Sequence, residues 1–206
     1  MNLEIDTETY KISSDNYYHT VYRKNQIILA GSLRKENFHI KRLQKKEYGK
    51  SKKWNTFTIS RGGKIYQHYF PKYYTDFMSE KEIDKNSISV VLENMGMLYY
   101  NYECSKFLNS INEECNETLV FEKNWKGSRY WEKYTEEQFN SLVELCKYLT
   151  NEYNIILDSL GFNVYHVDTA KFKGIVCRSN YNENFTDLNP FFDFKKFIKE
   201  LGIKYE

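Results

Sequence analysis

The segment at residues 87–94 constrains the fold more than any other part of the chain. Its sequence, SISVVLEN, is β-branched and mostly apolar, and Gly96 follows it. A strand that is apolar on both faces belongs inside a sheet rather than at its edge. Residues 26–30, QIILA, form a second short apolar run of the same kind. The two runs predict buried strands of one central sheet.

Two further patterns predict a hairpin and a long helix. Residues 54–59 and 65–69 are β-rich runs joined through a Gly62-Gly63 turn, which indicates a hairpin. Thr135 and Gln138 have the spacing of a capping box, and the helix that it opens runs to about residue 154. Apolar side chains recur at helical spacing along it and predict its buried face: Phe139, Leu142, Val143, Cys146, Leu149 and Tyr153.

The remaining segments complete an alternation of strands and helices. A looser helical spacing predicts a helix within residues 33–47, and residues 97–102 and 119–122 are predicted as extra strands. Three more elements are expected near the end of the chain, at residues 162–167, at 173–177 and in a last helix at 193–201. This order predicts an α/β fold, with a mixed central β-sheet flanked by helices.

Composition narrows the class of protein. The 206 residues, 41% of them hydrophobic, suit a single domain with a real core. A net charge of +2 does not indicate a globally basic nucleic-acid binder. No apolar run reaches the roughly 18 residues of a membrane helix. The four cysteines form no C-x-x-C pair, so free thiols are expected. The oligomeric state stays open.

The amino-acid bias of the chain indicates its source genome, and its first residues indicate where the protein is located. The chain has 19 Tyr and 14 Phe but only 9 Gly and 2 Pro, a skew typical of AT-rich genomes such as that of a phage or a low-GC bacterium. Its acidic start, MNLEID, has no apolar region of a signal peptide. The expected location is therefore the host bacterial cytoplasm or a phage virion.

Five segments, taken in order, resemble the amidase-2 family. They are IILAGS at 27–32, FTISRGGKIYQ at 57–67, NSISVVLEN at 86–94, YTEEQ at 134–138, and GIVCR to DLNPFFD at 174–193. This family includes zinc-dependent N-acetylmuramoyl-L-alanine amidases, phage lysozyme-amidases and peptidoglycan-recognition proteins. The resemblance covers about residues 26–197 of a single domain, with residues 97–133 as an insertion. It implies hydrolysis of the amide between the lactyl group of the sugar and the stem peptide.

The resemblance also implies three zinc ligands, and this sequence departs from all three. Ala30 or Gly31 stands at the first position, Cys177 at the second and Asn189 at the third, with Asp187 two residues before it. Two ligands with a neutral Asn are too weak for a catalytic zinc. No cofactor is therefore expected. The remaining candidates for metal or catalysis are Cys177 and Asp187, with His166 and His39 as the nearest further metal ligands.

A cleft without zinc is still expected to bind a ligand. The residues predicted to line it are Glu93, Asn94, Trp125, Tyr130, Trp131, Arg178, Asn180 and Asp187. Aromatic rings stack on sugars, bases and peptides, and the Arg178 guanidinium suits a carboxylate or a phosphate. The alternatives are that Trp125 and Trp131 close the core, that Arg178 clamps Asp187, and that Cys177 is a small buried hydrophobe.

Residues 34–53 hold nine Lys or Arg against two Glu, about +7. This stretch suits a phosphate-rich partner such as nucleic acid or teichoic acid, or it is a solvated helix face and loop.

Three hypotheses for function follow. The first is a degenerate amidase-like phage protein, a pseudoenzyme whose cleft binds a muropeptide or a small anionic, nucleotide-like molecule. The second is an active peptidoglycan amidase with a non-standard metal set. The third is a structural component of a virion.

Overall fold

A six-stranded sheet forms the centre of the molecule. The computed structural model describes residues 3–35, 40–41 and 52–204. In spatial order the strands are β1 (Ile5–Asp6), β4 (Ile65–Gln67), β3 (Phe57–Ile59), β5 (Ser87–Leu92), β2 (Gln26–Gly31) and β11 (Gly174–Cys177). Of these six strands, only β3 and β4 pair antiparallel, and they form the predicted hairpin. The mixed sheet and the central position of β5 are both confirmed.

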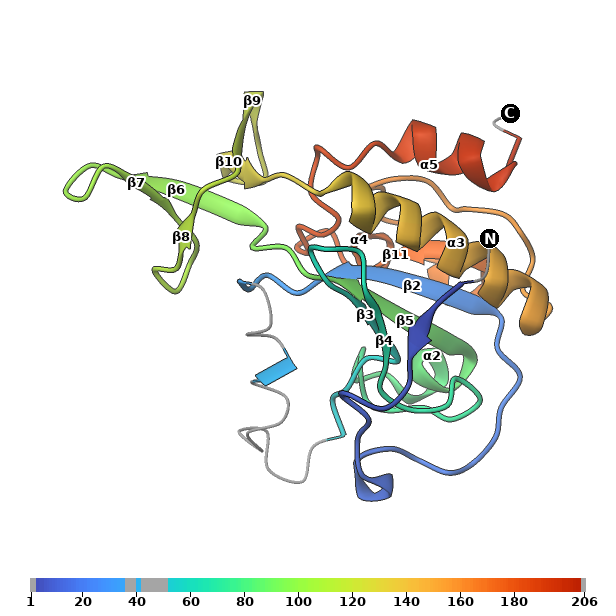
Figure 1. The fold of residues 1–206 in the computed structure, drawn as a ribbon. Helices are drawn as coiled ribbons and strands as arrows, with labels where there is room; N and C mark the ends of the chain where they lie inside the picture. Colours follow the sequence, from blue (N-terminus) through green and yellow to red (C-terminus); the bar gives the residue numbers. More distant parts are fainter. Residues whose placement is uncertain (1–2, 36–39, 42–51, 205–206) are drawn as a thin grey trace.

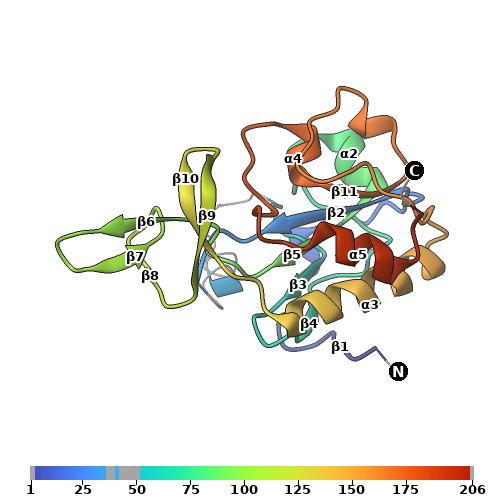
Figure 2. The same ribbon diagram turned by 90° about the horizontal axis from the view of Figure 1, so that it is seen from above.

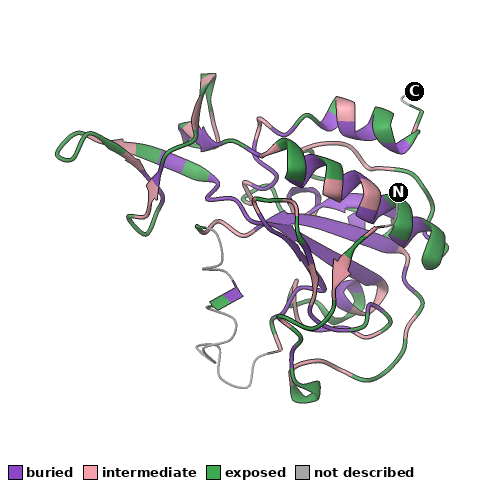
Figure 3. Ribbon diagram, in the orientation of Figure 1, coloured by how far each residue is buried: buried purple, intermediate pink, exposed green. Residues whose placement is uncertain are grey.

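Helices cover both faces of this sheet (Figure 1). The helices are α2 (Lys81–Asn86), α3 (Glu136–Glu152), α4 (Arg178–Tyr181) and α5 (Phe194–Leu201), with 3-10 turns at Ser14–Asn16 and Thr169–Lys171. Alternate strand residues point to opposite faces, so Ile27 and Leu29 of β2 pack with α3 and α5. Ile28 packs on the other side with Ile83 of α2 and Tyr181 of α4. Figure 3 shows the resulting buried centre.

The capping box predicted for α3 is present. Thr135 Oγ1 accepts a hydrogen bond from the Gln138 amide at 3.0 Å, and Gln138 Oε1 accepts one from the Thr135 amide at 3.3 Å. The predicted stripe is buried from Phe139 to Leu149, while Tyr153 is half-buried at the end of the helix. Leu145, which the spacing did not single out, is fully buried as well.

The Gly-Gly turn of the hairpin packs directly against α3. Gly63 has φ +79°, and a Cβ there would lie 2.9 Å from both the Glu137 carbonyl oxygen and Ser141 Oγ. The Ser141 hydroxyl donates to the Gly63 carbonyl at 2.6 Å. A residue without a side chain is therefore required for this close approach.

A second, five-stranded sheet projects from the body (Figures 1 and 2). It is antiparallel, with the spatial order β8 (Glu114–Cys115), β7 (Lys106–Leu108), β6 (Met97–Asn101), β10 (Ser128–Glu132) and β9 (Thr118–Trp125). The strands predicted at 97–102 and 119–122 are confirmed. That residues 97–133 are an insertion into an amidase-like domain stays a prediction.

Several other expectations have different outcomes. Residues 162–167 form no regular strand or helix, and the 3-10 turn at Thr169–Lys171 follows them. Most of the predicted helix at 33–47, and most of the basic stretch at 34–53, lies outside the described residues. All four cysteines are free. Within the described ranges, no helix is both long and apolar enough to cross a bilayer.

Candidate functional site

A buried ion pair lies where β2 and β11 end. Asp187, 1% exposed, comes from the loop between α4 and α5, and its Oδ2 accepts a hydrogen bond from the Gly31 amide at 2.9 Å. Arg178 Nε donates to Asp187 Oδ2 at 2.9 Å and lies 3.3 Å from Oδ1. The Asp187 carboxylate is therefore held from two sides, by a backbone amide and by a guanidinium.

Local sequence explains how these groups meet. Arg178 follows the last residue of β11 directly and begins α4, so its side chain starts at the end of the sheet. Gly31 ends the neighbouring strand, and a Cβ on it would lie 3.3 Å from Asp187 Cβ. The absence of a side chain at residue 31 gives Asp187 room to approach the backbone amide.

A second cation reaches the same loop from the other sheet. Lys126, in the turn between β9 and β10, donates from Nζ to the Phe185 carbonyl at 2.5 Å. The Arg178 guanidinium lies 4.5 Å from the centre of the Phe185 ring, and Lys126 Nζ lies 4.9 Å from the Trp125 ring. Burial lowers the pKa of Lys126, against the attraction of Asp187 and the exposed Glu183.

These groups form one site, named here the Arg178 site, which consists of Arg178, Lys126, Asp187, Phe185 and Trp125. Arg178 pairs with the buried Asp187 carboxylate, Lys126 binds the backbone of the same loop at Phe185, and each cation lies near an aromatic ring. Such a set can bind an anion that carries an apolar part. Lys126 was not among the predicted ligand-binding residues. The signal for it was its position in residues 125–131, which hold two Trp, one Tyr and two cations.

Besides Asp187, four of the predicted ligand-binding residues are buried in the structure, namely Glu93, Asn94, Trp131 and Asn180. Asn180 Oδ1 accepts from the Cys177 amide at 2.7 Å, and its Nδ2 donates to the Val164 carbonyl at 2.6 Å. Asn94 Oδ1 accepts from the Gly96 amide at 2.8 Å. These contacts hold the framework of the site together, and a ligand role for the four residues stays a prediction.

The three aromatic residues predicted to line the cleft lie on two different faces of the second sheet. Trp125 and Trp131 contact each other edge to face at 5.1 Å, and Trp131 is fully buried. Neighbouring residues of a strand point to opposite faces, so Tyr130 lies on the other side of β10. There it packs 5.0 Å from Phe107 of the second sheet. Tyr130 is thus separate from the Arg178 site, whereas Trp125 belongs to it.

The residues at the implied zinc position are buried or engaged by other groups of the protein. Burial raises the pKa of the Cys177 thiol to about 12. Asp187 is engaged by Arg178, and Asn189 Nδ2 donates to the Glu132 carbonyl at 2.8 Å.

The further metal candidates add no ligand set. His166 is exposed on a loop, and His39 lies outside the described residues. In the part of the chain that the structure describes, no three His, Cys, Asp or Glu side chains are grouped as ligands.

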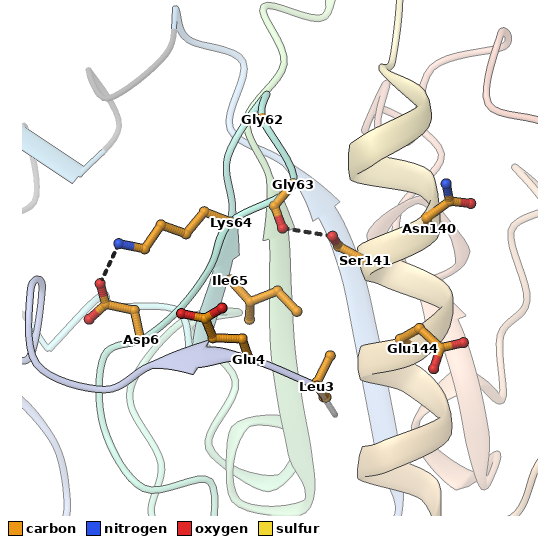
Figure 4. A pocket seen from close by; sticks show the side chains of 10 residues that line it. All are labelled: Leu3, Glu4, Asp6, Gly62, Gly63, Lys64, Ile65, Asn140, Ser141 and Glu144. Atoms are coloured by element: carbon orange, nitrogen blue, oxygen red, sulfur yellow. Dashed lines mark hydrogen bonds and ion pairs between the residues drawn. The ribbon is translucent and has the colours of Figure 1, made fainter. Parts of the chain in front are cut away.

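A separate pocket of about 370 Å³ lies between β1, the hairpin turn and α3 (Figure 4). Lys64 Nζ and Asp6 form an ion pair of 2.7 Å on its wall, and this contact holds the pKa of Asp6 well below its usual range. Ser141, on the opposite wall, donates a hydrogen bond from its hydroxyl to the Gly63 carbonyl. None of the residues predicted for the functional site lines this pocket.

Comparison with known proteins gives structural similarity without sequence similarity. No family model matches the sequence, and no curated protein matches it. Among solved structures, N-acetylmuramoyl-L-alanine amidase LysC from Clostridium intestinale superposes with a TM-score of 0.55 at 14% identity, over 98% of this chain and 99% of that one. The catalytic domain of XlyA gives a TM-score of 0.54 at 13% identity, over 97% and 99% of the two chains.

A third similar structure contains a ligand. AmpDh3 from Pseudomonas aeruginosa, in complex with an anhydromuramic pentapeptide, gives a TM-score of 0.52 at 14% identity. The match covers 98% of this chain and 67% of that chain. At such identities the comparison establishes the fold alone. The chain therefore has the fold of the N-acetylmuramoyl-L-alanine amidases, as the order of its sequence motifs predicted.

Proposed function

We propose that this protein binds a peptidoglycan fragment at the Arg178 site and does not hydrolyse it. The observation that carries the proposal is the Arg178–Asp187 ion pair at the ends of β2 and β11, with Lys126 as a second cation. A muropeptide joins a sugar to a peptide that ends in carboxylates. The site offers cations for a carboxylate, and aromatic rings for the apolar parts of the ligand.

The two cations are suited to different parts of this task. In the described contacts, Arg178 reaches Asp187 through Nε, which leaves its two terminal nitrogens as donors for a ligand. These two nitrogens match the two oxygens of a carboxylate. Lys126 is half-buried, and a charge attracts an anion more strongly where water is partly excluded.

Two features support binding over hydrolysis. Arg178 occupies the Asp187 carboxylate, so this group is not available as a general base. The buried Cys177 is a neutral thiol, because its pKa is raised to about 12, and a nucleophilic cysteine must be a thiolate. Whether the protein acts in the host cytoplasm or in a virion stays a prediction.

Calorimetry with a synthetic N-acetylmuramyl pentapeptide tests the proposal. The wild-type chain should bind it, and Lys126→Gln should weaken binding about tenfold or more, the scale of a charged hydrogen bond. Lys123→Gln is the matched control, since Lys123 is an exposed lysine three residues earlier in the same hairpin. Its affinity should equal that of the wild type.

Chromatography of the same mixtures, with and without added zinc, separates the alternatives. Intact ligand after long incubation agrees with the proposal. Release of the free peptide would instead support an active amidase with a non-standard metal set. Absence of muropeptide binding would reject the proposal, and it would favour a nucleotide-like ligand if one is bound, or a structural virion component if none is.

A further inference from the structure

The second sheet contains a groove that the proposed function does not use. In Figures 1 and 2 the β9–β10 hairpin rises steeply from the direction of β6 and β7, although β10 and β6 are paired. A cavity of about 440 Å³ lies in this part of the sheet. Its lining includes Leu98, Tyr100, Tyr102, Asn124, Arg129 and Tyr130. This volume is in the range of small-ligand pockets.

A continuous row of aromatic rings runs along this part of the sheet. Tyr102 contacts Tyr100, Tyr100 contacts Phe107, and Phe107 contacts Tyr130, each with ring centres 5.0 Å apart. Two of the rings, Phe107 and Tyr130, pack on a small buried cluster of Met95, Leu98 and Cys115. Tyr102, at its end, is 85% exposed. One end of the row is thus packed on the buried cluster, while the other end, Tyr102, faces solvent.

Charge favours a neutral ligand. Residues 97–133 contain five Lys or Arg and six Glu, a net charge of −1. A surface that binds a nucleic acid or another polyphosphate needs an excess of positive charge. The aromatic row therefore lacks the excess of cations that would pair with the phosphates of stacked bases.

The edge of the groove is polar. Asn124 and Arg129 are exposed, and Ser110 also lines the cavity. Arg129 Nε donates to the Phe121 carbonyl at 3.1 Å, which holds the guanidinium against β9. A pyranose places C–H groups on its faces and hydroxyl groups around its edge. The C–H faces suit the electron-rich faces of the tyrosines, and the hydroxyl groups suit the polar edge.

We infer that this groove is a glycan-binding site that takes a neutral oligosaccharide. Its residues are separate from the Arg178 site, although the β9–β10 turn contributes Lys126 to one and Gly127 to the other. The inference does not depend on the proposed muropeptide binding. A neutral oligosaccharide has no carboxylate for Arg178 or Lys126, so the two ligands are tested separately.

The test is a calorimetric titration of the full chain with a β-1,4-linked N-acetylglucosamine tetramer. The wild type should bind saturably, and Tyr102→Ala should weaken binding about tenfold, because it removes one stacking ring. Tyr102 is largely exposed, so its loss leaves the fold intact. Tyr165→Ala, at a 51% exposed tyrosine outside this sheet, is the matched control and should bind as the wild type does. Lys126→Gln should also bind the tetramer normally.

Three results would overturn the inference. The first is no saturable binding of the tetramer by the wild type. The second is equal weakening by Tyr102→Ala and Tyr165→Ala. The third is self-association in sedimentation that Tyr102→Ala abolishes, which would make the aromatic row a contact between copies of the chain.

Discussion

Arg178 Nε lies 2.9 Å from Asp187 Oδ2, and the same oxygen accepts the Gly31 amide at 2.9 Å. One carboxylate oxygen thus joins the end of β2, the start of α4 and the loop that leads to α5. The sequence predicts Arg178 as a residue that lines a ligand-binding cleft, with a clamp on Asp187 as the alternative. The structure contains that clamp, and the ligand role of Arg178 stays a prediction.

Arg178→Ala should lower the free energy of unfolding by about 3–5 kcal/mol, because it leaves the buried Asp187 carboxylate without its counter-charge. Urea denaturation measures this loss. Arg178→Ala combined with Asp187→Asn should recover much of it, since the double variant buries no unpaired charge. A single variant as stable as the wild type would show that the pair contributes nothing to the fold.

Gly31→Ala should destabilise the protein by about 1–2 kcal/mol, since its Cβ would lie 3.3 Å from a side chain that the ion pair holds in place. Gly62→Ala is the matched control, because a Cβ there meets nothing within 4 Å. Thermal unfolding of both variants is the measurement. Equal melting temperatures would mean that Asp187 moves aside freely.

The sequence predicted the elements whose signals are local. The apolar runs of β2 and β5, the Gly62-Gly63 turn and the capping box of α3 each lie within a few residues, and each is found in the structure. The short helix α2 was not predicted. Its residues are polar, and the Asp84 carboxylate bonds the amides of Met78 and Glu80, which no apolar periodicity reveals.

The site was harder to predict because its contacts join distant parts of the chain. Lys126 and Phe185 are 59 residues apart, and no local pattern indicates that the β9–β10 turn reaches that loop. Asn94 was predicted to line the ligand-binding cleft, and that role stays a prediction. In the structure its Oδ1 accepts hydrogen bonds from the Gly96 amide and from Asn189 Nδ2, and Asn189 is 95 residues away.

Leu142→Ala should cost about 2–5 kcal/mol of stability, because Leu142 is fully buried between α3 and the central sheet. Leu157→Ala provides the comparison, since Leu157 is 41% exposed and its truncation leaves no cavity. Denaturation curves of the two variants should differ by most of the predicted loss. Similar curves would contradict the assignment of this helix face to the core.

Lys24 should make stability depend on pH. It is 2% exposed, and burial lowers its pKa from 10.5 to about 7, against the attraction of Asp84. Between these two pH values the unfolded chain holds a proton on Lys24 that the folded chain has lost, so stability should rise as the pH rises. Asp84 does not obscure this effect, because burial raises its pKa only to about 6.

Lys24→Met removes the titrating group. The variant should be more stable than the wild type at pH 7, by about 2 kcal/mol, and should gain less as the pH is raised to 9.5. Urea denaturation at several pH values in this range, below the titration of the buried tyrosines, measures both effects. Lys195→Met changes an exposed lysine and should follow the wild-type curve. A wild-type stability that is flat between pH 7 and 9.5 would show that Lys24 stays charged in the fold.

The protein purified without chelator should carry well under one zinc per chain. Of the groups at the implied metal position, the Ala30 side chain offers no ligand atom, and Cys177 is a buried neutral thiol. The side-chain amide of Asn189 donates a hydrogen bond to the Glu132 carbonyl of β10. The Asp187 carboxylate is held by Arg178. Elemental analysis after dialysis gives the stoichiometry.

Arg178→Ala is a second informative variant, since it removes the cation beside Asp187. This variant should also remain without zinc, because one carboxylate cannot replace the three ligands that a catalytic zinc takes. One tightly held zinc per wild-type chain would contradict this account, and Asp187→Asn and Cys177→Ser would then identify which of the two residues binds it.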